Sequence, residues 1–72
     1  MRKFSVLVEQ DEDGVYVAHV PSLPGCHTQG KSLAVVEKRI EEAIKLYLEV
    51  ARKRRTPVQQ NRFVGAHLVE VA

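Results

Sequence analysis

The sequence predicts an α+β fold in which an antiparallel-rich sheet carries one long helix on one face, in the order β-β-β-α-β. Two observations lead to this prediction. A long stretch in the second half has helical periodicity and contains no Gly or Pro. Three short strand-like segments precede it, separated by turn residues, and one more follows it. With 72 residues the chain is long enough for one small domain, and we assign residues 1–72 to that domain.

The composition is that of an ordinary globular protein, with 44% hydrophobic and 28% charged residues. The net charge of +2 is too small to indicate nucleic acid as a partner. A single cysteine, Cys26, excludes an internal disulfide and fits a reducing compartment. The N-terminus carries no apolar run of signal-peptide length, and no segment approaches the ~20 apolar residues of a membrane span. We therefore expect a cytoplasmic protein with no membrane contact.

The first two strands form a predicted antiparallel hairpin. Phe4 to Val8 alternates between apolar and other residues, and Val15 to Val20 is rich in β-branched residues. The turn between them, Gln10 to Gly14, ends on a glycine that can adopt positive φ.

The sequence leaves the register of this hairpin open. A four-residue loop would place Val17 opposite Val8. A loop of three or five residues would place Ala18 there and exchange the two faces of the sheet.

The third strand and the helix follow a bend. Pro21 to Gly25 must interrupt the sheet, because proline cannot donate to a strand ladder, and Cys26 to Gln29 is the expected third strand. Ser32 is a suitable N-cap for a helix from Leu33 to about Arg55. One stripe of that helix is apolar and should face the sheet: Leu33, Val36, Ile40, Ala43, Ile44, Tyr47 and Ala51.

The helix should end before Thr56-Pro57, since the residue before a proline avoids the α region. On its surface, Glu41 with Lys45 and Glu49 with Lys53 have the favourable i, i+4 order. Pro57 to Asn61 reads as a polar connection, and Phe63 to Val71 as the last strand, weakened at Gly65.

This domain should expose more apolar surface than a monomer tolerates. One helix covers one face of the sheet, yet both faces carry apolar side chains. The helix, at roughly 34 Å, should also extend beyond strands that reach only about 20 Å. We expect a homodimer, with larger assemblies such as a tetramer also open, and contacts with a partner at Leu7, Val15, Val17, Leu46 and Val50.

No group of residues indicates catalysis, a metal or a cofactor. The possible metal ligands are His19, Cys26, His27 and His67, but Cys26 and His27 are adjacent on a strand and should point to opposite faces. As a nucleophile, Cys26 has no partner at a characteristic spacing.

Charged residues gather at two places. Glu9, Asp11, Glu12 and Asp13 surround the first turn, where they suit a solvated loop better than the rigid carboxylates of a two-metal nuclease. Asp11, Glu12 and Asp13 could alternatively form a negative patch for a basic partner. The basic run Arg52 to Arg55 complements the free carbonyls of a helix C-terminus, and contact with RNA or DNA phosphates is the alternative.

A stretch of the sequence resembles a known family. The matching features are Tyr16-x-Ala18 before Pro21, the bend Leu23-Pro24-Gly25-Cys26, the step Thr28-x-Gly30, and a helix containing Glu42-Ala43-Ile44. Together, over roughly residues 3 to 50, they resemble the HicB family, the antitoxin half of HicA–HicB modules.

The resemblance implies a partial ribonuclease-H-like fold, generally dimeric or tetrameric. It implies a non-enzymatic domain that binds a small mRNA-cleaving, HicA-like toxin and shields its catalytic histidine. Many family members continue into a helix-turn-helix or ribbon-helix-helix segment that binds DNA. Residues 1–72 supply none, so we expect no DNA binding from them. The alternatives are a metal-dependent ribonuclease-H-like nuclease and a solitary structural oligomer without a toxin.

Overall fold

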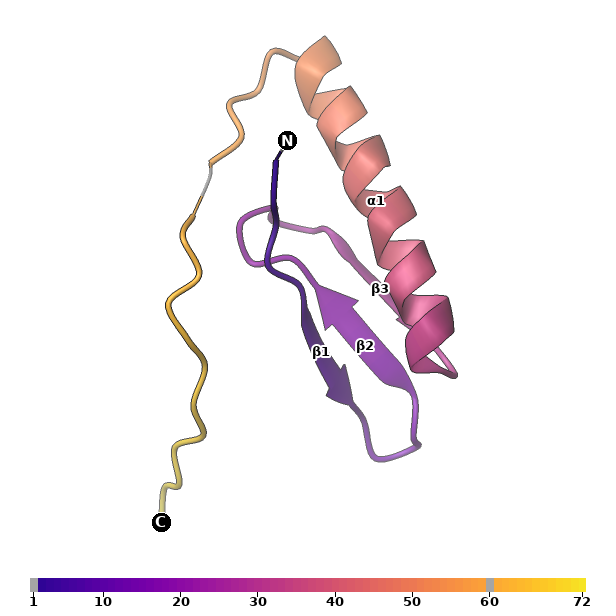
Figure 1. Ribbon diagram of the computed structural model, residues 1–72, viewed down its shortest axis with the longest axis vertical. Helices are drawn as coiled ribbons and strands as arrows, with labels where there is room; N and C mark the ends of the chain where they lie inside the picture. Colours follow the sequence, from indigo (N-terminus) through magenta and orange to yellow (C-terminus); the bar gives the residue numbers. More distant parts are fainter. Residues whose placement is uncertain (1, 60) are drawn as a thin grey trace.

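The computed structural model describes residues 2–59 and 61–72, so that Met1 and, in the predicted connection, Gln60 lie outside the described residues. Three antiparallel strands are followed by one helix: β1 (Leu7–Gln10), β2 (Tyr16–His19), β3 (His27–Gly30) and α1 (Leu33–Lys53). The strands form a sheet in the order β1-β2-β3, and α1 lies across one face of it (Figure 1). The predicted α+β class, with one long helix on one face, is confirmed.

The first hairpin has the five-residue loop, because Val8 lies opposite Ala18. Asp11 holds this loop together: its Oδ1 accepts hydrogen bonds from the backbone N–H of Asp13 (2.9 Å) and of Val15 (3.0 Å). Gly14 adopts φ +82°, a conformation that few other residues tolerate. This register directs Tyr16 and Ala18 toward the helix.

The core lies between β2, β3, the bend that joins them, and α1. Most of the predicted helical stripe packs there, and Leu48, outside that stripe, also packs against the core. Leu33 does not, because it lies in the first turn and is exposed beyond the end of the sheet. The buried residues of this core are Ala18, Val20, Leu23, Cys26, Val36 and Ile40.

Three predicted boundaries shift. β1 lies later than the predicted Phe4 to Val8, because Glu9 and Gln10 continue the pairing with β2. β3 begins one residue later than predicted, at His27. The helix ends at Lys53, since Arg55 turns to φ +54° and the N–H of Thr56 donates to the carbonyl of Ala51 at 2.9 Å.

The predicted last strand, Phe63 to Val71, is wrong for this protomer. Residues 61–72 are extended but contain no strand, and their large apolar side chains are exposed. The tail runs in the same direction as β1 (Figure 1). Within the described residues α1 packs on β2 and β3 and makes no contact with β1, so no layer covers a strand added beyond β1. Among the described residues no strand pairs with the tail, and the alternating pattern alone does not produce a strand.

None of the described residues form a helix with both the length and the apolar character needed to span a bilayer.

Candidate protein-interaction surface

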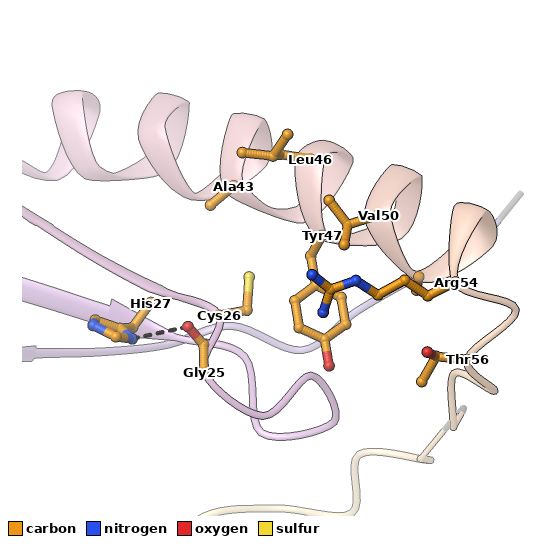
Figure 2. A pocket seen from close by; sticks show the side chains of 10 residues that line it. Gly25, Cys26, His27, Ala43, Leu46, Tyr47, Val50, Arg54 and Thr56 are labelled. Carbon is orange, nitrogen blue, oxygen red and sulfur yellow. Dashed lines mark hydrogen bonds between the residues drawn. The ribbon is translucent and has the colours of Figure 1, made fainter.

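An apolar groove of about 390 Å³ runs between the C-terminal half of α1 and the start of β3 (Figure 2). The helix contributes two neighbouring rows of side chains at i, i+4 spacing. One row turns inward to the core, and the other, which includes Leu46 and Val50, forms the outer lip. Leu46 is 63% exposed, which is high for a leucine beside a core. The lining residues are Gly25, Cys26, His27, Ala43, Leu46, Tyr47, Val50, Ala51, Arg54 and Thr56.

The bend between β2 and β3 forms the other wall of this groove. Three backbone hydrogen bonds close the bend: Val20 N–H to Cys26 O (3.0 Å), Leu23 N–H to Val20 O (3.0 Å) and Cys26 N–H to Leu23 O (2.9 Å). Leu23 fills the core at 1% exposure. Gly25 adopts φ +84°, which allows the chain to reverse. These hydrogen bonds and the buried Leu23 anchor the bend to the core, so that Gly25 and Cys26 form one side of the groove.

The remaining motif residues serve the fold in different ways. Tyr16 packs against the core, whereas Pro21 and Pro24 lie at the surface of the bend. At Gly30 a Cβ atom would lie 3.0 Å from Val35 Cγ1, so a side chain there would crowd the helix where it meets the end of β3.

Cys26 and His27 add polar character to the groove. The Sγ of Cys26 points toward the helix (Figure 2), and burial raises the pKa of its thiol, which keeps it protonated and poorly nucleophilic. The Nδ1 atom of His27 lies 3.1 Å from the carbonyl oxygen of Gly25, which orients the ring at the rim. At the far end, Arg54 supplies a positive charge.

The predicted contact residues fall on two separate surfaces. Leu46 and Val50 line the groove, whereas Leu7 and Val17 lie on the sheet face away from α1, as the strand register shows. That face is mixed, because Glu9, His19 and Gln29 share it. Val15 lines a separate hollow with Lys31, Val35 and Arg39, at the edge near the helix start.

The two charged clusters are exposed. Asp11, Glu12 and Asp13 lie in the first loop, where the carboxylate of Asp11 is engaged with backbone N–H groups. Arg52 to Arg55 surround the end of α1, where Arg54 is the C-cap. His19 lies opposite His27, yet among the described residues no three His, Cys, Asp or Glu side chains gather as a metal site would require.

Sequence reasoning missed that the bend residues Gly25 and Cys26 also form a wall of the groove. The available signal was that Leu46, Val50 and Arg54 repeat every four residues beside the core stripe. The opposite wall could not be predicted, because the strand end that lies beneath this row depends on how the helix crosses the sheet.

The fold and its surfaces define a small α+β domain with one long amphipathic helix and an open apolar groove. Residues 4–70 match the family described as the HicB-like antitoxin of bacterial toxin-antitoxin systems. The chain belongs to this antitoxin family.

Relatives support the assignment. A UPF0150 protein of Archaeoglobus fulgidus is 54% identical over 69 residues, covering 96% of this chain and 94% of the relative. Another, from Thermoplasma acidophilum, is 49% identical over 51 residues, covering 71% of this chain and 74% of the relative. The crystal structure of the N-terminal domain of Burkholderia pseudomallei antitoxin HicB is similar, with a TM-score of 0.71 and 28% identity. That match covers 85% of this chain and 72% of the other.

Proposed function

We propose that this chain is a non-catalytic antitoxin domain that oligomerises and neutralises a small mRNA-cleaving, HicA-like toxin by binding it in the cytoplasm. The observation that carries the proposal is the open apolar groove on a member of the HicB-like antitoxin family. Exposed apolar side chains on a rigid support are typical of a protein-binding surface.

The chemistry of the groove supports binding over catalysis. Its lining is mostly apolar, and its thiol is held in the protonated form. The acidic loop also supports binding over catalysis, because the carboxylate of Asp11 accepts hydrogen bonds from backbone N–H groups of its own loop. Glu12 and Asp13 give that loop a negative surface that suits a basic partner.

Co-expression with a HicA-like toxin tests the proposal. The toxin should co-purify with this chain and lose its ribonuclease activity. Leu46→Asp should release the toxin and restore its activity, because a carboxylate placed in an apolar contact is left without its water. Leu33→Asp is the matched control, since Leu33 is also an exposed leucine on α1 and lies outside the groove. A toxin that stays free and active beside the unaltered chain would refute the proposal.

The same preparations test the rival nuclease hypothesis. We expect no hydrolysis of an RNA–DNA hybrid with magnesium or manganese. Activity that EDTA removes, and that Asp11→Asn and Asp13→Asn also remove, would establish the nuclease instead.

A further inference from the structure

The tail, residues 61–72, carries an unusual amount of exposed apolar surface. Its large apolar side chains are between 56% and 102% exposed: Phe63, Val64, Leu68, Val69 and Val71. Because an extended chain alternates its side chains, Phe63, Val69 and Val71 share one side, and Val64 and Leu68 the other. Such a segment becomes a strand only where it gains a hydrogen-bonded neighbour.

The outer edge of β1 offers that hydrogen-bonded neighbour. The N–H of Asp11 donates to the carbonyl of Val15 at 2.9 Å, which sets the alternation of the ladder. By that alternation, Leu7 and Glu9 direct their backbone groups to β2, and Val8 and Gln10 direct theirs outward. In the part of the chain that the structure describes, no strand pairs with this edge.

The opposite edge of the sheet is better protected. Arg39 Nη1 donates a 2.8 Å hydrogen bond to the carbonyl of Gln29 in β3, and α1 packs on that strand. A side chain that caps an edge carbonyl hinders the addition of another strand. The edge of β1 is therefore the better acceptor.

Charge argues against the protomer's own tail as the occupant. The start of the tail, Asn61 to Gly65, shares a hollow with Ser5 and Leu7, and the tail continues in the direction of β1 (Figure 1). Paired in that direction, Glu70 would come alongside Glu12 and Asp13, where like charges repel.

A second copy removes the charge conflict. A two-fold axis perpendicular to the strands presents the β1 of the second copy in the opposite direction, so that tail and strand run antiparallel. With Glu70 opposite Lys3 of the second copy, the antiparallel register brings Arg62 opposite Asp11 of that copy, so that both pairs have opposite charges.

We propose that two copies of this chain exchange their tails, and that residues 63–71 of each add an antiparallel strand to the β1 edge of the other. This inference rests on the oligomerisation included in the proposed function, and it names the surface responsible. The exchange makes the contact reciprocal, as a two-fold dimer requires.

Sedimentation equilibrium gives the first test. The full chain should be a dimer at micromolar concentration, and a chain ending at Arg62 should have a dissociation constant at least about 100-fold higher. A helical far-UV circular dichroism signal and a cooperative thermal transition would show that the truncated chain is folded, since the core residues precede the tail. If the folded truncated chain remains dimeric, the exchange is refuted, but the proposed toxin binding is not. If the full chain is monomeric, both the exchange and the proposed oligomerisation are refuted, and the co-expression experiment alone then decides on toxin binding.

Full-length cysteine variants decide which tail occupies the edge. In a Cys26→Ala background, Lys3→Cys and Glu70→Cys are prepared as separate proteins, mixed and oxidised. We expect a disulfide-linked heterodimer, and a mixture of Lys3→Cys with Glu49→Cys, whose cysteine lies on α1, is the control that should not link. The double variant, with both cysteines in one chain, should give linked dimers. A double variant with Asp13→Cys and Glu70→Cys in the same background tests the protomer's own tail, which would bring residue 70 alongside residue 13. If that variant closes into a cross-linked monomer, the occupant is the protomer's own tail and the exchange is refuted.

Discussion

The body of the protein, which comprises the sheet and α1, and its tail, residues 61–72, contain similar aliphatic residues that differ in how far they are exposed. Leu23 in the bend between β2 and β3 is 1% exposed, whereas Leu68 in the tail is 102% exposed. The helix and the sheet enclose the side chains of the body, whereas no second layer covers the tail within residues 2–59 and 61–72. The difference shows that an apolar residue is buried only where the tertiary structure supplies neighbours, whatever its own hydrophobicity.

The largest expected difference between the body and the tail is in how a leucine-to-alanine substitution changes the free energy of unfolding. Leu23→Ala should lower the free energy of unfolding by about 2–5 kcal/mol, because it opens a cavity in the core. Leu68→Ala should change the unfolding of the monomer by less than about 0.5 kcal/mol. Urea denaturation at low protein concentration measures both, and an equal loss for the two variants would contradict the comparison.

Two glycines provide a second, smaller contrast. Gly30→Ala should cost about 1–3 kcal/mol, since its Cβ would meet Val35 Cγ1 at 3.0 Å and Val36 Cγ2 at 3.1 Å. Gly65→Ala is the control, because a Cβ there meets nothing within 4 Å. Thermal unfolding of both variants checks this, and a neutral Gly30→Ala would show that the start of the helix can move away from the sheet.

The smallest expected effect is the pH dependence that Cys26 contributes. Burial raises the pKa of this thiol above its ordinary value of 9.0, so the unfolded chain loses the proton first as the pH rises. The contribution to stability is complete below about pH 9 and declines above it. Urea denaturation from pH 8 to 10 should show a shallower decline in Cys26→Ala than in the unaltered protein. Identical slopes would mean that the thiol is solvated in the folded state.

Residues whose neighbours are close in sequence were predicted well. The N-cap is confirmed by a 3.2 Å hydrogen bond from the N–H of Val35 to Ser32 Oγ. The ion pair of Glu41 with Lys45 is present at 3.3 Å, and that of Glu49 with Lys53 at 3.6 Å. The candidate surface was predicted in part: Leu46 and Val50 were identified, but the bend that forms the opposite wall was not.

The sequence by itself determined the long helix, its N-cap, the bend before β3 and the α+β class, because each depends on periodicity or on turn residues within a short span. The tertiary structure decided the register of the first hairpin, through the Asp11 loop, and the separation of the apolar residues into a groove and a sheet face. It also decided that Phe63 to Val71, despite a strand pattern, is not a strand in the protomer. A strand needs a neighbour from elsewhere in space, and a one-dimensional pattern does not specify where that neighbour lies.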